Sequence, residues 1–121
     1  MLNLTQHNLT PNQILDGVIE PEDKEYIRSL LTIDHIPSEE ELISIAQKIS
    51  DYAASLNASS AMIGGAMYLM PYLVFELNKR NIEAYYSFSK RVSRDILQED
   101  GTVKKEIFFN HSGFVKATLP K

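Results

Sequence analysis

The stretch NASSAMIGG, residues 57–65, decides the fold of this chain. Its polar start is typical of a turn. The next three residues, Ala61-Met62-Ile63, are apolar on both faces, as a central parallel strand should be. Gly64 and Gly65 then end the strand, and a helical pattern follows. A buried strand leading directly into a helix indicates an α/β protein.

Further helices and strands are predicted on both sides of this strand. They follow from capping boxes, from apolar spacing and from aromatic or β-branched runs. In chain order they are a strand at 2–5, a helix after the capping box Thr10-Pro11-Asn12-Gln13, a short helix from Pro21, a helix capped by Ser38 and Glu41, the strand at 61–63, a helix to about Arg80 with Pro71 in its first turn or at a kink, a strand at 82–88, and two strand-like runs at 91–97 and 103–109.

Two local features carry more specific expectations. Ile14, Leu15 and Val18 are predicted to form the buried face of the first helix. Asp100-Gly101 predicts a hairpin with a type I′ turn, in which both central residues have positive φ. The segment His111-Ser112-Gly113 is expected to break the second arm of that hairpin.

The element order predicts an α/β fold class: a small Rossmann-like three-layer domain, with a parallel β-sheet core and a C-terminal antiparallel β-hairpin. Strand–helix–strand alternation implies parallel strands with right-handed crossovers. The hairpin is expected to extend the sheet at one edge or to project as an arm. The 121 residues are enough for one domain and too few for two, so residues 1–121 are predicted to form a single domain.

Composition excludes several classes of protein. The net charge of -4 argues against binding of long nucleic acid. The chain has no cysteine, which excludes disulfides, thiolate-bound zinc and a cysteine nucleophile. Three scattered histidines without an acidic cluster predict no metal and no cofactor. No signal peptide or membrane span is visible, so the expectation is a cytoplasmic protein without a membrane partner.

The candidate site lies where the parallel strands end. In open α/β sheets, ligands bind outside the carboxyl ends of the strands, so the loops after the three predicted parallel strands should meet. Their hydroxyls, amides, imidazole and cations suit a polar or phosphorylated ligand. The predicted catalytic residue is His7, and the predicted ligand-binding residues are Thr5, Gln6, Asn8, Gly64, Gly65, Ser87, Ser89, Arg91 and His111.

Each candidate also has an ordinary structural interpretation. His7 could transfer a proton or donate to a phosphate, or it could satisfy backbone groups in its loop. Gly64-Gly65 could admit a phosphate beside a helix N-terminus, or make a tight turn. Ser87, Ser89 and Arg91 form a possible phosphate clamp or a polar loop. His111 could fold back to the site or face solvent.

The N-terminal segment LNLTQHNLTPNQ, residues 2–13, resembles the start of the small stand-alone CRISPR-associated ring nucleases. That resemblance implies a compact fold related to CARF domains, a homodimer, and metal-independent cleavage of cyclic oligoadenylate in antiviral defence. It touches Thr5, His7, Asn8 and Thr10. The segments 62–66 and 109–115 also look like those of an uncharacterised bacterial and phage family of this length.

Three functions are compatible with these residues. The first is binding, with metal-free cleavage, of a small phosphorylated ligand such as a cyclic oligonucleotide second messenger, in defence or counter-defence. The second is a non-enzymatic nucleotide-binding or sponge protein. The third is a small dimeric interaction module whose hairpin docks a partner. The ligand hypotheses require the three loops to enclose a pocket.

Overall fold

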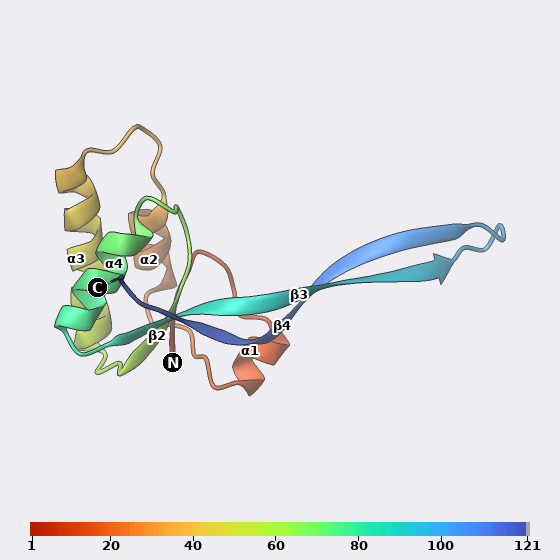
Figure 1. Cartoon of the computed structure of the whole chain (residues 1–121), viewed down its shortest axis with the longest axis horizontal. Helices are drawn as coiled ribbons and strands as arrows, with labels where there is room; N and C mark the ends of the chain where they lie inside the picture. The colour runs from red at the N-terminus through yellow and green to blue at the C-terminus, as the bar shows by residue number, and fades with distance from the viewer. Residues whose placement is uncertain (121) are drawn as a thin grey trace.

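The computed structural model describes residues 1–120 (Figure 1). Its helices and strands, in chain order, are β1 (Leu2–Leu4), α1 (Pro11–Leu15), α2 (Lys24–Leu31), α3 (Glu39–Ser55), β2 (Ser60–Ile63), α4 (Met70–Lys79), β3 (Glu83–Leu97) and β4 (Val103–Ala117). The chain is thus an α/β protein.

The four strands form one open sheet in the order β1-β2-β3-β4. β1 and β2 are parallel, as are β2 and β3, with Ala61 opposite Leu2 on one side and Ala84 on the other. β3 and β4 are antiparallel over their whole length. Because the order follows the sequence without reversal, the sheet has no topological switch point of the kind that defines binding crevices in doubly wound folds.

Helices α2, α3 and α4 group together on one side of the strands, and α1 lies apart from them near β4 (Figure 1). The shared core contains Ile27 of α2, Ile49 of α3 and Leu73 of α4, each with no exposed surface. Ala84 of β3 joins this core. Side chains of a strand alternate between its two faces, so Ser87 points away from the face that carries Ala84. Ser87 accepts a hydrogen bond from Gln13 of α1, which places α1 on the face of β3 opposite the helical core.

Local capping explains where the helices begin. Thr10 and Gln13 form the predicted capping box of α1, and Ser38 and Glu41 form that of α3. Pro71 lies in the first turn of α4, where its missing N–H costs nothing.

Two predictions about the first helices were wrong. α1 has no buried residue: Ile14 is 58% exposed and Leu15 83%, and only Val18, beyond the helix, is buried. A five-residue helix lying off the main helical layer has no core to cover. The second helix begins at Lys24 and not at Pro21, because the Asp23 side chain caps the Tyr26 N–H.

The predicted strand at 82–88 and the hairpin arm at 91–97 are one continuous strand, β3. Likewise, 111–113 does not end the second arm, since β4 runs through it to Ala117. The outer part of this hairpin, residues 90–110, projects from the rest of the chain (Figure 1) and is called the arm below. Residues 1–89 and 111–120 are called the body.

The turn at the tip of the arm lies where Asp100-Gly101 predicted it, but its type differs. Gly101 has φ +86°, whereas Asp100 is not among the residues with positive φ. The Gln98 N–H donates to the Thr102 carbonyl at 2.7 Å and the Gly101 N–H donates to the Gln98 carbonyl at 3.0 Å. A three-residue loop with glycine last therefore replaces the two-residue I′ turn.

Candidate functional site

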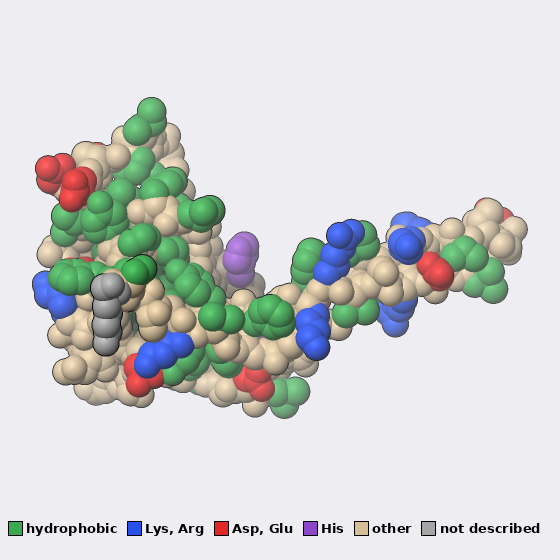
Figure 2. All heavy atoms as spheres, in the orientation of Figure 1, with side chains coloured by type: hydrophobic (Ala, Val, Ile, Leu, Met, Phe, Trp, Pro, Cys, Tyr) green, Lys and Arg blue, Asp and Glu red, His purple; other side chains and the backbone are tan. Residues whose placement is uncertain are grey.

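A cleft of about 440 Å³ opens where the parallel strands end. It includes parts of all three predicted loops. Six of the ten predicted site residues line it, namely Thr5, His7, Asn8, Gly64, Ser87 and Ser89. The remaining lining residues are Thr10, Gln13, Met62, Ile63, Tyr86 and Phe109. The molecule is visibly hollowed between the body and the arm (Figure 2).

The first loop of the cleft is held from beneath by a polar network. Thr5 donates its hydroxyl to the Asn3 side-chain oxygen at 2.7 Å, and its backbone N–H reaches the same oxygen at 3.0 Å. Both residues are buried. The Asn3 amide in turn donates to the His7 carbonyl at 2.9 Å. Thr5 therefore lines the cleft with its hydroxyl already engaged in shaping the loop.

Two cations of α2 fix the same loop from the side. Lys24 Nζ donates to the carbonyls of Thr5 at 2.6 Å and His7 at 2.9 Å. Burial lowers the pKa of the Lys24 ammonium, and Glu20 at 3.3 Å opposes that change. Arg28 donates to the Gln6 carbonyl at 3.1 Å and to the Asn8 side-chain oxygen at 2.7 Å. Three successive backbone carbonyls of the loop, those of Thr5, Gln6 and His7, are therefore held by hydrogen bonds.

His7 differs from its neighbours because its side chain is exposed and is not used in this network. Within residues 1–120, the His7 imidazole makes no hydrogen bond, while its carbonyl accepts from Asn3 and Lys24. A fixed backbone that presents a free imidazole at a cleft can donate to, or exchange a proton with, a bound group.

Gly64 and Gly65 have different roles. Gly64 lines the cleft, and a Cβ there would lie 3.5 Å from the Thr5 methyl group, an ordinary contact. Gly65 has φ +146°, which favours glycine, and does not line the cleft. α4 begins only at Met70, with Leu69 as an uncapped N-cap, so the expected helix N-terminus directly after the glycines is absent.

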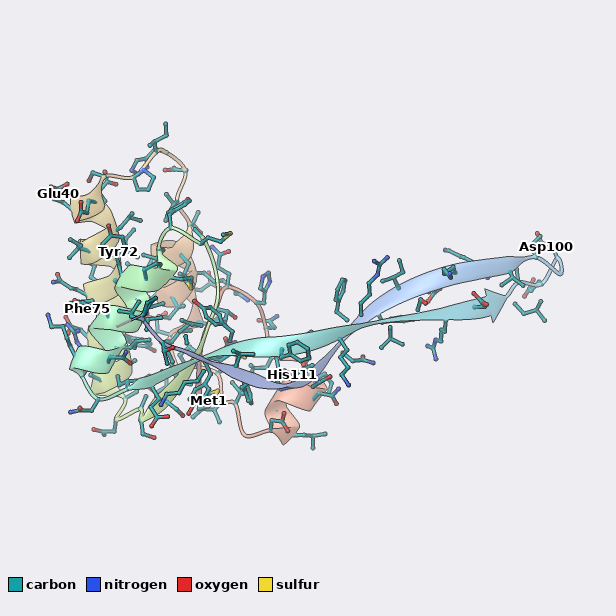
Figure 3. All side chains as sticks on the ribbon, in the orientation of Figure 1. Met1, Glu40, Tyr72, Phe75, Asp100 and His111 are labelled. Atoms are coloured by element: carbon teal, nitrogen blue, oxygen red, sulfur yellow. The ribbon has the colours of Figure 1, made fainter. Side chains whose placement is uncertain are left out.

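The third loop and β4 form a chain of hydrogen bonds through His111. Ser87 Oγ lies 2.6 Å from His111 Nδ1, and His111 Nε2 lies 2.8 Å from Asp16 Oδ2. The His111 side chain is 1% exposed, whereas that of Asp16 is 47% exposed. The Gln13 amide also donates to Ser87 Oγ at 3.3 Å. Figure 3 places His111 where the arm leaves the body, beside α1.

A β-bulge turns His111 to this face. Ser87 pairs with Phe114 and Phe88 with Gly113, but Ser89 pairs with His111, so Ser112 is an extra residue in β4. In a regular ladder His111 would pair with Lys90 and point to the opposite face, because paired residues share a face. Gly113 has φ +151°, a backbone conformation that favours glycine.

Three of the predicted residues besides His111 lie outside the cleft. The Gln6 side chain donates to the Thr32 hydroxyl at 3.2 Å, toward the end of α2. Gly65 contributes only backbone geometry, as described above. Arg91 is exposed on the arm, on the face of β3 that carries Ser87 and Ser89, and pairs with Phe109, which does line the cleft.

Asp16, Gln13 and the α2 cations were not predicted as site residues. Gln13 had already been assigned to the capping box, and Asp16 follows a short helix with no motif around it. Its partner His111 lies 95 residues away in the sequence. One weak local signal exists: a carboxylate at a helix C-terminus is electrostatically unfavourable, so it invites a search for a partner.

Burial raises the pKa of the Tyr86 phenol on the cleft wall, so this hydroxyl stays protonated at neutral pH.

Within residues 1–120, no group of three or more His, Asp or Glu side chains is arranged to hold a metal ion. In the same residues, no helix is long and apolar enough to cross a membrane.

The fold and the cleft define an α/β protein with a candidate ligand-binding site at the ends of its parallel strands. The chain belongs to the Uncharacterized protein MJ1673 family, whose family model matches residues 1–115. The match includes every residue of the cleft and all of the arm. Comparisons with curated proteins and with solved structures give no match.

Proposed function

We propose that this protein binds a small phosphorylated ligand, such as a cyclic oligonucleotide second messenger, in the cleft between the three strand-end loops. One observation supports this most directly: all three strand-end loops line one cleft, although the first loop is more than 50 residues from the other two in the sequence. If they had diverged, the ligand hypotheses would have failed. Free donors at the cleft suit phosphate oxygens, and Arg91 lies two residues beyond Ser89, toward the arm.

The finer form of the proposal is a ring nuclease in antiviral defence or counter-defence. The polar segment with Thr5, His7 and Asn8, on which the resemblance rests, lines the cleft. In this form the ligand's own 2′-hydroxyl attacks the phosphorus, without a metal, and His7 moves a proton or donates to the phosphate. The alternative is a sponge that holds the nucleotide intact. A cytoplasmic location is part of the proposal.

A Rossmann-like three-layer arrangement is the fold that this proposal expects. Support comes from the parallel strands β1, β2 and β3 and from α1, which contacts the face of β3 away from α4. The proposal treats residues 1–121 as one domain of this kind.

The test uses a panel of cyclic and linear oligonucleotides with mass-spectrometric readout of binding and cleavage, in the presence of a chelator. We expect the cyclic ligands to bind, and His7→Ala to weaken binding or slow cleavage by about tenfold or more. The matched control is His35→Ala, an exposed histidine on the connector between α2 and α3.

The outcomes separate the alternatives. A ligand that binds and is recovered intact favours the sponge. Unchanged cleavage by His7→Ala shows that His7 has no catalytic role. If no member of the panel binds, ligand binding in the cleft is wrong.

We also propose that the arm contacts a second copy in a homodimer. A free two-stranded ribbon is marginally stable in water, and this one exposes large apolar side chains on both faces. They are Val92, Leu97, Val103, Ile107 and Phe109. Covering this surface would stabilise the arm.

Sedimentation velocity at increasing protein concentration tests the dimer. We expect association that Ile107→Lys weakens, because it places a charge on the arm surface. Ile36→Lys is the matched control, since Ile36 is 95% exposed on the body. A chain that stays monomeric at all concentrations contradicts the proposal.

A further inference from the structure

Ser87, His111 and Asp16 form a hydrogen-bonded chain from three separate segments of the sequence. Ser87 lines the cleft, the His111 ring is buried behind it, and Asp16 closes the chain from the end of α1. The two hydrogen bonds measure 2.6 and 2.8 Å. The spatial order is therefore hydroxyl at the ligand, imidazole behind it, and carboxylate behind the imidazole.

The hydrogen bonds fix the tautomer of the imidazole. A carboxylate only accepts, so Asp16 requires the proton of the neutral ring to be on Nε2. Nδ1 then carries a lone pair and accepts from the Ser87 hydroxyl. Phe114 restricts the ring further, with its centroid 4.8 Å from that of His111. This is the arrangement in which a histidine takes a proton from serine.

Local structure alone does not account for these residues. The bulge at Ser112 is needed to bring His111 to the face of Ser87, and bulges are frequent beside active sites, where they re-aim a side chain. Asp16 lies at the C-terminus of α1, where a carboxylate is unfavourable without a partner. The Gln13 amide, 3.3 Å from Ser87 Oγ, occupies one lone pair of that oxygen and leaves another for the cleft.

We propose that His111, oriented by Asp16, activates the Ser87 hydroxyl as a nucleophile toward phosphate esters bound in the cleft. Ser87 Oγ forms a bond to phosphorus, the bond from phosphorus to the leaving oxygen breaks, and the serine proton passes through His111 Nδ1 to that oxygen. Water then attacks the phosphoserine, its proton passes through His111 to Ser87 Oγ, and the Oγ–phosphorus bond breaks. The net reaction consumes one water per ester.

This mechanism supplies the nucleophile from the chain, whereas the ring-nuclease form of the proposed function takes it from the ligand's 2′-hydroxyl. The nature of the ester as a phosphate ester rests on the proposed function. The activation of Ser87 does not, because it follows from contacts within the protein.

A fluorophosphonate probe tests the activation. Attack by Ser87 Oγ on its phosphorus expels fluoride and leaves a stable phosphonylated serine, which peptide mass spectrometry locates. We expect wild-type protein to be labelled at Ser87 and Ser87→Ala to lose that label. His111→Gln should lower the labelling rate by about 10²–10⁴-fold, the range typical of a lost general base.

Two further variants separate activation from a structural role. Asp16→Asn changes an exposed carboxylate and should also slow labelling, while the thermal unfolding midpoint shows whether the fold is kept. Ser93→Ala is the matched control, because Ser93 is exposed on the same face of β3, away from any histidine, and its loss should not change the label.

Absence of label at Ser87 in the wild-type protein, or equal rates in wild type and His111→Gln, overturns the inference. The probe does not depend on nucleotide binding. Labelling without binding of any oligonucleotide therefore contradicts only the proposed function, and binding without labelling contradicts only the activation of Ser87.

Discussion

The inner and outer parts of β3 belong to one continuous strand but lie in different surroundings. The inner part pairs with β2 on one side and β4 on the other, and it covers the helical core, so that Ala84 has no exposed surface. The outer part pairs with β4 alone. There Leu97 is 74% exposed and Val103, its partner, is 62% exposed.

This difference shows what the hydrogen-bond ladder does and does not provide. Both parts have β-branched or aromatic residues and pair with β4, apart from the bulge at Ser112, and this pairing is sufficient to define their strand conformation. Only the inner part has fully buried apolar side chains, and burial contributes most of the favourable free energy of folding. The cleft lies at the boundary, so most of its residues are anchored by the body, while Phe109 lies on the arm, where it pairs with Arg91.

The largest expected difference between body and arm is in the cost of replacing a leucine by alanine. Leu73→Ala in α4 removes a fully buried side chain and should lower the free energy of unfolding by about 2–5 kcal/mol. Leu97→Ala on the arm should change it by no more than about 0.5 kcal/mol. Urea unfolding, followed by circular dichroism at a concentration where the chain is monomeric, measures both values.

Equal losses for the two variants would mean that the arm is packed in solution as firmly as the body. A loss at Leu97 that appears only at high protein concentration would instead indicate that a second copy covers the arm.

A smaller effect on stability, one that depends on pH, is expected at His35, an exposed residue of the body. Its ring contacts the carboxylates of Asp34 at 2.9 Å and Glu41 at 2.5 Å, and hydrogen bonds first to Asp34 and then to Glu41 raise the pKa of His35. A raised pKa in the folded state stabilises the fold below the unfolded value of about 6.5, and this contribution is lost as pH rises through the folded pKa. Because solvent screens the pair, the change in stability should be small.

Proton NMR titration of the His35 ring measures this shift directly. Glu41→Gln should lower the midpoint, whereas Glu40→Gln, a matched change at a neighbouring exposed carboxylate, should leave it nearly unchanged. A midpoint that is not above 6.5 in the wild-type protein would show that the two carboxylates do not hold the ring in solution.

Much of the body could be predicted because its signals are local. Thr10 with Gln13 and Ser38 with Glu41 fixed the starts of two helices through contacts three residues apart. The apolar run at Ala61-Met62-Ile63 identified a central strand, and all three of these residues are buried. The convergence of the loops around Thr5, Gly64 and Ser87 followed from parallel pairing alone.

The errors occurred where a contact distant in sequence overrode a local pattern. The pattern of Ile14 and Leu15 predicted a buried face, but α1 lies where no core surrounds it. The segment from His111 to Gly113 was predicted to end the strand, because serine and glycine occur both at strand ends and at β-bulges. Only pairing with β3 distinguishes the two.

By itself, the sequence determined the α/β class, the parallel core, the position of the hairpin and the loops that carry polar groups. These depend on periodicity and on capping, which act over a few residues. The tertiary structure decided the strand order, the projection of the arm and the chain from Ser87 through His111 to Asp16. Those depend on a one-residue bulge and on contacts across 24 and 95 residues, which no local pattern encodes.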